Sequence, residues 1–202
     1  MEKEIKEVDL YDFDQTIVPF DSGTFFVFHC LVHYPWIILF APVILIAAIL
    51  MITHIISFTS FKKICYIFVP FVPLEKAVKN FWDKHEKYVY PWFHNRERYT
   101  IVISASPDFL LREIQSRLGF EKLICTRHNR KTGTIIGKNC RDDEKVKRLY
   151  KEYGRDEIRV VDVYSDSLRH DKHIFSLAQG NCYNIVRGKR IQFNYKDKYK
   201  NG

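Results

Sequence analysis

Short apolar runs alternate with longer segments of helical periodicity along most of the chain. The apolar runs cover residues 8–13, 99–103, 122–126 and 158–164. Charged segments such as residues 142–153 place apolar residues at helical spacing. Short continuous apolar runs are typical of strands that are buried on both faces, and their alternation with helices favours a mostly parallel sheet. We therefore predict an α/β fold.

Turn and capping residues indicate where several elements begin and end. Ser106 and Pro107 are suited to the N-cap and first position of a helix that ends before Gly119. Residues 131–134 predict a hairpin turn, and residues 184–195 predict a closing hairpin around a central glycine.

Charge is distributed unevenly along the chain. Residues 23–61 contain no Asp, Glu, Lys or Arg, and within them residues 34–53 are strongly apolar. About 20 apolar residues are enough for a helix to cross a lipid bilayer. The whole chain nevertheless carries a formal net charge of +8, which favours anionic partners such as phosphates, nucleic acid or an acidic membrane face.

Cysteine and histidine usage bears on compartment and metal binding. The five cysteines are an odd number and lack metal-ligand spacing, which indicates reduced thiols in the cytoplasm. The first ten residues mix acids and bases, so no secretory signal is expected. His33, His54 and His94 are isolated from one another, and we predict that they are not metal ligands.

Polar residues follow three of the predicted strands. Asp12 and Asp14 end the first, Ser104 follows the second, and Asp166 follows the last apolar run. The carboxyl ends of parallel strands form the usual ligand-binding edge of such a sheet, so these side chains are expected to converge. Two carboxylates two residues apart suit a divalent cation, a nucleophile and a proton-transferring acid, although a solvated turn is the commoner meaning of that pair alone.

In their order along the chain, these residues resemble the four motifs of the haloacid dehalogenase superfamily of phosphohydrolases, in the branch that includes phosphoserine phosphatase. The matching segments are Asp12-x-Asp14-x-Thr16, Ser104, Lys145 within residues 139–146, and Asp166 within residues 164–167. The resemblance implies a Rossmann-like parallel sheet with an inserted helical cap. Residues 1–19 and 97–202 would form the catalytic core, and residues 20–96 the cap, with an apolar stretch at residues 24–59.

The resemblance also implies a role for each motif residue. Asp12 would attack phosphorus and form an aspartyl-phosphate, while Asp14 would protonate the leaving oxygen and then activate water. Thr16, Ser104 and Lys145 would form the phosphate-binding set, with Thr16 holding the geometry of the first motif. Phosphoryl transfer depends mainly on positioning and on neutralising oxygen charge, which these residue types provide.

The cofactor that the resemblance implies is Mg²⁺. Its ligands would be Asp12, the backbone carbonyl of Asp14, and Asp166, in keeping with the preference of Mg²⁺ for few carboxylates and several waters. The branch usually has a second acid four residues after Asp166. This chain has His170 there, so Asp171 is the further candidate metal ligand.

Two residues close to the first motif carry separate predictions. Gln15 stands where the branch commonly has glycine, so we expect altered local packing with the chemistry retained. Asp21 lies where the linker into the cap passes the site. It either faces the leaving group, as a substrate-contacting residue of the cap, or serves as a hinge-turn residue.

The apolar stretch is not a single membrane span if the four motifs form one site. Asp12 precedes it and Ser104 follows it, so one crossing would separate them. The remaining alternatives are a hairpin that enters and leaves the bilayer on one side, a helix in the interface, or burial within the cap or a homodimer. With membrane contact, Lys62, Lys63 and Trp36 are expected at the level of the lipid headgroups.

The cap and motifs also resemble, more loosely, the membrane-associated phosphatases of the phosphatidylglycerophosphatase C type. The matching features are the apolar run, Trp92-Phe93, Ser104-x-Ser106-Pro107 and residues 164–167. This second resemblance implies a lipid-linked phosphomonoester as the substrate, reached along a membrane surface.

Three functional hypotheses follow. The leading one is a Mg²⁺-dependent phosphomonoester hydrolase that acts through an aspartyl-phosphate on a lipid phosphate, such as phosphatidylglycerophosphate, at the cytoplasmic face of the membrane. The first alternative is a phosphatase for a small soluble substrate, such as phosphoserine or a sugar phosphate, with the apolar cap used for packing or dimerisation. The second is a non-catalytic membrane or nucleic-acid binding protein. The chain shows no recognisable nucleic-acid module, so we expect no nucleic-acid partner.

Overall fold

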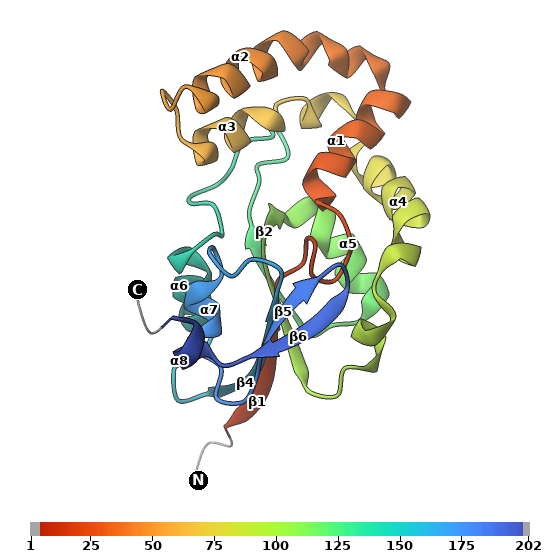
Figure 1. Ribbon diagram of the computed structural model, residues 1–202. Coiled ribbons are helices and arrows are strands. Elements are labelled where there is room, and N and C mark those ends of the chain that lie inside the picture. The colour runs from red at the N-terminus through yellow and green to blue at the C-terminus, as the bar shows by residue number, and fades with distance from the viewer. Residues whose placement is uncertain (1–4, 200–202) are drawn as a thin grey trace.

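The computed structural model describes residues 5–199, which fold around a six-stranded sheet (Figure 1). The strands are β1 (Lys6–Tyr11), β2 (Tyr99–Pro107), β3 (Lys122–Thr126), β4 (Ile158–Ser165), β5 (Cys182–Val186) and β6 (Lys189–Phe193). Their spatial order is β3-β2-β1-β4-β5-β6, and every neighbouring pair is parallel except β5 and β6. The predicted α/β fold with a mostly parallel sheet is confirmed.

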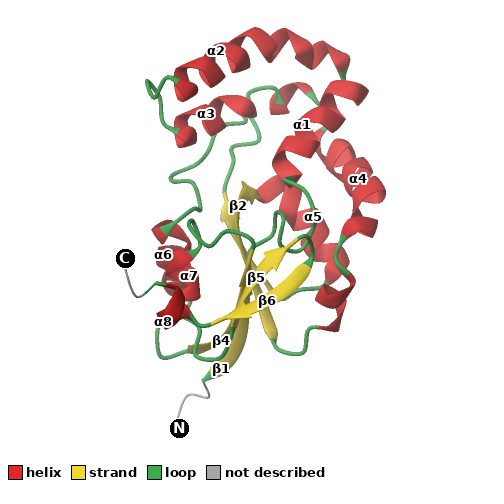
Figure 2. Cartoon of the chain, in the orientation of Figure 1, coloured by secondary structure: helices red, strands yellow, loops and turns green. Residues whose placement is uncertain are grey.

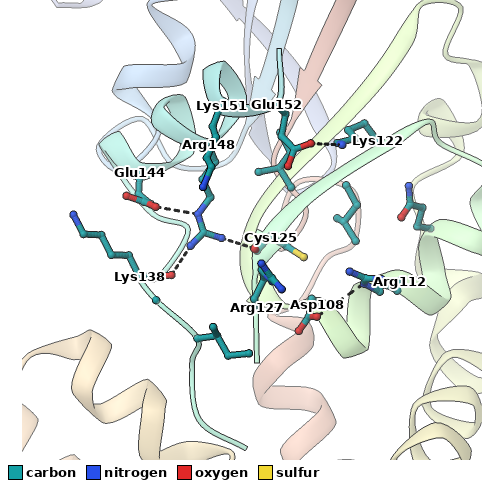
Figure 3. A pocket seen from close by; sticks show the side chains of 15 residues that line it. Asp108, Arg112, Lys122, Cys125, Arg127, Lys138, Glu144, Arg148, Lys151 and Glu152 are labelled. Atoms are coloured by element: carbon teal, nitrogen blue, oxygen red, sulfur yellow. Dashed lines mark hydrogen bonds and ion pairs between the residues drawn. The ribbon is translucent and has the colours of Figure 1, made fainter. Parts of the chain in front are cut away.

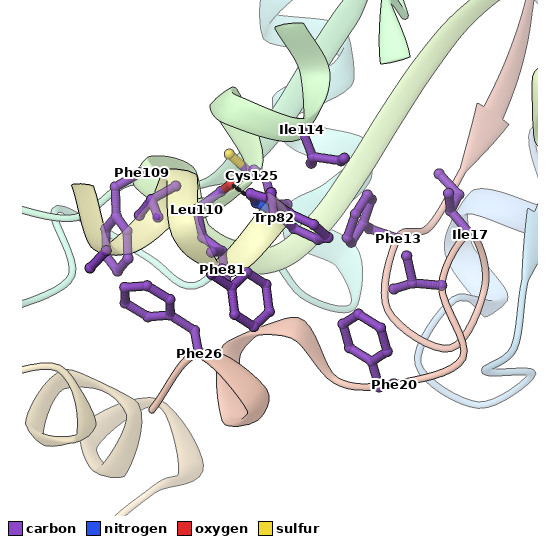
Figure 4. Close-up of a cluster of buried hydrophobic side chains, with 14 of the residues drawn as sticks. Phe13, Ile17, Phe20, Phe26, Phe81, Trp82, Phe109, Leu110, Ile114 and Cys125 are labelled. Carbon is purple, nitrogen blue, oxygen red and sulfur yellow. Dashed lines mark hydrogen bonds between the residues drawn. The ribbon is translucent and has the colours of Figure 1, made fainter. Parts of the chain in front are cut away.

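The central strands are buried on both faces because their side chains alternate between two apolar clusters. On β2, Ile101 and Ile103 pack in one cluster and Val102 packs in the other. The core helices are α5 (Asp108–Leu118), α6 (Asp143–Glu152), α7 (Lys172–Phe175) and α8 (Tyr195–Lys198). Helices α6 and α7 contribute to the first cluster, and α5 contributes to the second. Figure 4 shows the second cluster, in which α5 meets aromatic side chains from the segment between β1 and β2.

The start of α5 differs from the sequence prediction. Strand β2 continues through Ser106, and α5 begins at Asp108 with Pro107 as its N-cap residue and no side-chain cap, so the predicted capping role of Ser106 is wrong. The physical reason is that the Ser106 hydroxyl donates to the Asp14 carboxylate at the end of β1. The other end is as predicted: Gly119 follows the helix with a left-handed φ of 66°, which glycine adopts without strain.

Between β1 and β2 the chain forms a layer of helices over residues 20–96, for which we keep the name cap. Its elements are α1 (Ser22–His33), α2 (Ala41–Ile52), α3 (Phe58–Cys65) and α4 (Leu74–His85), with 3₁₀-helices η1 (Pro35–Phe40), η2 (Val69–Phe71), η3 (Glu86–Tyr88) and η4 (Pro91–Asn95). Asp21 and Ser57 are the N-caps of α1 and α3, and each accepts a hydrogen bond from a backbone amide of the first turn. The first three helices stand beyond the carboxyl ends of the strands (Figure 2).

The most apolar part of the cap is η1 together with α2, residues Pro35–Ile52. Among the described residues it is the one helical segment long and apolar enough to cross a membrane, judged by length and composition, and only 11% of it is buried. It runs beside α3 (Figure 1). The flanking strands β1 and β2 are direct neighbours in the sheet, so the segment does not carry the chain away from the rest of the fold.

Candidate active site

The carboxyl end of β1 delivers Asp12 to the centre of the cap-facing edge of the sheet. The Asp12 amide donates to the Tyr164 carbonyl of β4 at 2.9 Å. Its side chain is buried, and Oδ1 accepts a hydrogen bond from Lys145 Nζ at 2.7 Å. Burial raises the pKa of Asp12 to about 8; Lys145 opposes that rise, while Asp171 and Asp166 add to it. The first and third motifs are therefore in direct contact.

Lys145 lies between two carboxylates. It belongs to the first turn of α6, and its Nζ is 2.7 Å from Asp12 Oδ1 and 2.7 Å from Asp171 Oδ1. Ser165 Oγ donates to the other Asp171 oxygen at 2.5 Å and so fixes its orientation. Burial by itself lowers the pKa of Lys145, but the two carboxylates outweigh burial and raise it, so the lysine stays charged.

The second carboxylate of the first motif faces the cap. Asp14 Oδ1 accepts from the Ser22 amide at 2.7 Å, at the start of α1, and Oδ2 accepts from Ser106 Oγ. Burial and then the nearby Asp21 charge raise the pKa of Asp14. A carboxyl group with a raised pKa is suited to proton donation near neutral pH. Sequence reasoning missed Ser106 as a site residue; its position two residues after Ser104 on a strand was the available signal.

Thr16 and Ser104 are both buried and hold the loops of the site. Thr16 Oγ1 accepts from the Asp166 amide at 2.9 Å and donates to Asp166 Oδ1 at 3.4 Å. Ser104 Oγ accepts from the Ser106 amide at 3.0 Å. Burial, followed by the charge of Asp171, raises the pKa of Asp166 to about 6. The first, second and fourth motifs thus meet at one edge of the sheet.

Both departures from the family motifs have a structural account. Gln15 is exposed and has a φ of 56°, in the left-handed region that favours glycine, which explains why glycine is common there. His170 lies at the rim of the site, with Nδ1 2.9 Å from Asp142 Oδ1 and Nε2 2.6 Å from Arg141 Nη2. Asp171, one residue later, is buried and forms an ion pair with Lys145.

The donor set of the site fits a hard divalent cation. Beyond the effect of burial, the charge of Asp166 helps to raise the pKa of Asp12. The charge of Asp171 helps to raise the pKa of Asp12 and that of Asp166. A cation beside these carboxylates would relieve that repulsion, and oxygen donors are what Mg²⁺ prefers. Within residues 5–199 no group of three or more His, Cys, Asp or Glu side chains is arranged to hold a metal ion. The candidate Mg²⁺ ligands are thus two side chains, Asp12 and Asp166, and one backbone oxygen, the Asp14 carbonyl.

Two cap residues, Asp21 and Lys62, lie close to the site. Asp21 is the N-cap of α1, where its Oδ1 accepts from the Thr24 amide at 2.7 Å, as a turn residue would. Contrary to the sequence prediction, Lys62 does not project from the cap surface toward a bilayer, because its Nζ donates to the Ala105 carbonyl at 3.1 Å, next to Ser104. The other predicted headgroup residues, Lys63 and Trp36, are exposed.

A cavity of about 670 Å³ lies apart from the motif residues, beside the edge strand β3 (Figure 3). Basic side chains line it, but Arg148 pairs with Glu144 at 3.0 Å and Lys122 pairs with Glu152 at 2.5 Å. Its lining residues include none of the predicted site residues Asp12, Asp14, Thr16, Ser104, Lys145 and Asp166. The candidate active site is therefore the edge of the sheet under the cap, and not this cavity.

Solved structures share the fold. A protein of unknown function from Bordetella pertussis Tohama I matches 81% of this chain over 83% of its own, with a TM-score of 0.66 and 16% identity. A phosphoserine phosphohydrolase-like protein from Francisella tularensis subsp. tularensis SCHU S4 matches 89% of this chain over 87% of its own, with a TM-score of 0.55 and 14% identity. The predicted likeness to the phosphoserine phosphatase branch is thus confirmed at the level of fold.

Sequence comparison identifies the family. Protein CicA of Caulobacter vibrioides, from two strains, is 34% identical over 94 residues, which is 44% of this chain and 41% of the relative. This chain thus matches about two-fifths of the length of those relatives. The family model for haloacid dehalogenase-like hydrolases matches residues 10–174, a range that contains all four motifs. The motif residues of this chain meet around Asp12 and Lys145. The predicted enzyme class is confirmed: the chain belongs to the haloacid dehalogenase-like hydrolase family.

Proposed function

We propose that this hydrolase cleaves phosphomonoesters through an aspartyl-phosphate on Asp12. The observation that carries the proposal is the buried chain of contacts from Asp12 to Lys145 to Asp171, with Asp14 held separately by Ser106. One carboxylate is thereby oriented toward a phosphoryl group, while another has a raised pKa and faces the cap, where a leaving group would lie.

The two carboxylates divide the chemistry between them. Asp12 attacks phosphorus with the oxygen that Lys145 does not hold, and the bond between phosphorus and the leaving oxygen breaks as Asp14 donates its proton to that oxygen. Asp14 then accepts a proton from the water that attacks the aspartyl-phosphate, and inorganic phosphate departs with Asp12 restored. Lys145 and Ser104 offset the charge of the transferring phosphoryl oxygens.

The proposal includes Mg²⁺, held by Asp12, Asp166 and the Asp14 backbone carbonyl. When bound, the ion would neutralise phosphoryl charge and orient the group for in-line attack. Asp171 contributes indirectly, because its ion pair with Lys145 keeps that lysine charged and in place.

We further propose that the substrate is a lipid phosphate reached at a membrane surface. The supporting feature is the outer face of the cap, here called the apolar face, whose exposed side chains are Ile38, Leu39, Val43, Leu45, Ile46, Ile49 and Ile52. Contiguous exposed apolar surface of this kind marks an interaction site. Beside it lies an apolar groove of about 660 Å³ lined by residues of α1, η1 and α2.

Three further features favour a lipid surface as the occupant of the apolar face. Trp36 is half exposed and donates its indole N–H to the Phe71 carbonyl at 2.9 Å, an amphipathic arrangement suited to the headgroup level. Lys63 is exposed on the adjacent helix, and the net charge of +8 attracts anionic lipid. The five cysteines are unpaired, which supports the reduced, cytoplasmic side of the membrane.

The test is phosphate release from phosphatidylglycerophosphate in liposomes, with and without Mg²⁺, with phosphoserine in solution alongside and Asp12→Asn as the blank. Mg²⁺-dependent release from the liposomes, absent in Asp12→Asn, is the expected result. Release from phosphoserine alone would keep the chemistry and overturn the lipid assignment. Release by Asp12→Asn at the wild-type rate would overturn the covalent mechanism.

A further inference from the structure

A lysine of the cap reaches into the candidate active site. Lys62 is in the last turn of α3 and is partly buried, whereas its neighbour Lys63 is exposed. Lys62 Nζ donates to the carbonyl of Ala105, which lies in β2 between Ser104 and Ser106. Among residues 5–199, Lys62 makes no ion pair with a carboxylate, although the charges of Asp14 and Asp21 act on it from nearby.

A second cation, Arg141 of the core, lies near the same aromatic ring as Lys62. The Arg141 guanidinium lies 4.7 Å from the centroid of the Phe58 ring, and Lys62 Nζ lies 5.7 Å from the same ring. Phe58 is the first residue of α3, so both positive side chains lie near one aromatic ring of the cap. Arg141 Nη2 also lies 2.6 Å from His170 Nε2, and its Nε pairs with the Asp142 carboxylate at 3.8 Å.

Two cations brought together in this way repel each other. Burial has the largest effect and lowers the pKa of Lys62; the charges of Asp14 and Asp21 act to raise it, and the smaller effect of Arg141 lowers it again. Partly buried like charges without a shared counter-ion cost free energy, and an oxyanion placed between them would recover it. Arg and Lys donors around one anion are also a common way to bind phosphate.

The position of these cations matches the order of groups in one class of lipid. Helix α3, which carries Lys62, packs on α2 of the apolar face and lies between that helix and the sheet (Figure 1). Proceeding inward, the molecule thus presents an apolar surface, then the two cations, then Asp12. A phospholipid whose headgroup ends in a phosphomonoester presents acyl chains, then a phosphodiester, then the terminal phosphate.

We propose that Lys62 and Arg141 form a second anion subsite, which binds the internal phosphodiester of a lipid whose terminal phosphomonoester is cleaved at Asp12. The inference rests on the proposed function and adds to it the residues that recognise the internal phosphodiester. It makes Lys62 and Arg141 specificity-determining residues, because a lipid with only one phosphate gains nothing from them.

The test compares kcat/KM for phosphatidylglycerophosphate and for phosphatidate with the same acyl chains, in the same mixed micelles. Wild type should prefer the lipid with two phosphates, and Lys62→Met and Arg141→Met should each reduce that preference about tenfold or more, mainly through KM. Lys76→Met, at an exposed lysine of α4, is the control and should keep the wild-type preference. Thermal melts of each variant verify folding.

A soluble pair of substrates separates this subsite from the membrane proposal. The deacylated headgroup, which carries a phosphodiester and a phosphomonoester, is compared with glycerol 3-phosphate. A Lys62-dependent preference for the deacylated headgroup supports the subsite even if liposomes are not substrates. Equal losses on all substrates in Lys62→Met would overturn the subsite while leaving the phosphatase intact. A Lys62-dependent preference for phosphoserine over phosphoethanolamine would replace the phosphodiester with a carboxylate and overturn the assignment.

Discussion

Ser106 illustrates how much of the site depends on single side chains outside the motifs. Its hydroxyl donates to Asp14 Oδ2, and its amide donates to Ser104 Oγ, so it links the proposed proton-transferring acid to the proposed phosphate-binding serine. The remaining Asp14 oxygen is held by the Ser22 amide of the cap. Asp14 is therefore oriented jointly by β2 and by the first turn of α1.

Replacing Ser106 with alanine should lower kcat by about 10–100-fold, because one hydrogen bond to the partly buried Asp14 carboxyl group is lost and that group is less firmly oriented. Steady-state phosphate release measures the effect, with KM expected to change little. Ser176→Ala is the matched control, since Ser176 is exposed and its hydroxyl donates to the His173 carbonyl, away from the site. An unchanged kcat in Ser106→Ala would show that the cap amide alone orients Asp14.

At the scale of elements, the hairpin turn at residues 131–134 of the core packs against the cap. Gly133 has a φ of 72°, and a Cβ built there would lie 1.7 Å from the Tyr66 carbonyl oxygen of the cap. Gly137 has a similar φ of 77° but has no atom within 4 Å of such a Cβ. The two glycines therefore differ in contact with the cap while sharing a left-handed backbone conformation that would strain any other residue.

Gly137→Ala should cost about 1 kcal/mol of unfolding free energy, from the left-handed backbone alone. Gly133→Ala should cost about 1–3 kcal/mol more, because the backbone of the cap must move away. Urea titration of both variants measures the difference. Equal costs at the two positions would mean that the hairpin does not bear on the cap in solution.

The apolar face is the second feature that belongs to this scale. Leu39 and Leu45 are 78% and 62% exposed, so replacing both with lysine removes apolar area from the surface without disturbing the core. The double variant should bind anionic liposomes at least about tenfold less than wild type while keeping its melting temperature. Ile191→Lys on β6, where Ile191 is 51% exposed, is the control. Equal liposome binding by the double variant and wild type in co-sedimentation would contradict membrane contact through α2.

At the scale of the whole molecule, two buried histidines make stability depend on pH. Burial lowers the pKa of His29 and of His128 to about 4 in each case, below the ordinary value of 6.5. His128 packs against the rings of Tyr66 and Phe109, and its Nε2 is buried without a hydrogen-bond partner. The unfolded chain binds these protons at higher pH than the folded chain does.

The contribution of these two histidines to the free energy of unfolding should therefore be fully present above pH 6.5 and be lost as the pH drops from 6.5 toward 4, by up to about 3 kcal/mol for His128. His128→Phe keeps the aromatic packing and should flatten part of that fall. His94→Gln, at an exposed histidine, should leave the pH dependence as it is. Chemical denaturation at several pH values measures how the free energy of unfolding depends on pH in each protein. The same dependence in His128→Phe and in wild type would contradict the assignment.

Local sequence patterns were enough to predict the strands, the α/β class and the order of the motifs. Residues 122–126 form a strand as predicted, and Gly119 ends α5, because apolar runs and glycine conformations are properties of short segments. The convergence of Asp12, Ser104 and Asp166 at one edge also followed from sequence, since parallel strands place their carboxyl ends together.

Only the tertiary structure decided which way individual polar side chains point. Ser106 was predicted as a cap and Lys62 as a headgroup contact, yet both face the site, because their partners, Asp14 and Ala105, are distant in sequence. Sequence determined that residues 34–53 are apolar, but not that most of η1 and α2 is left uncovered. Periodicity reports the preferences of a single segment, whereas exposure and ion pairing depend on which segments pack against one another.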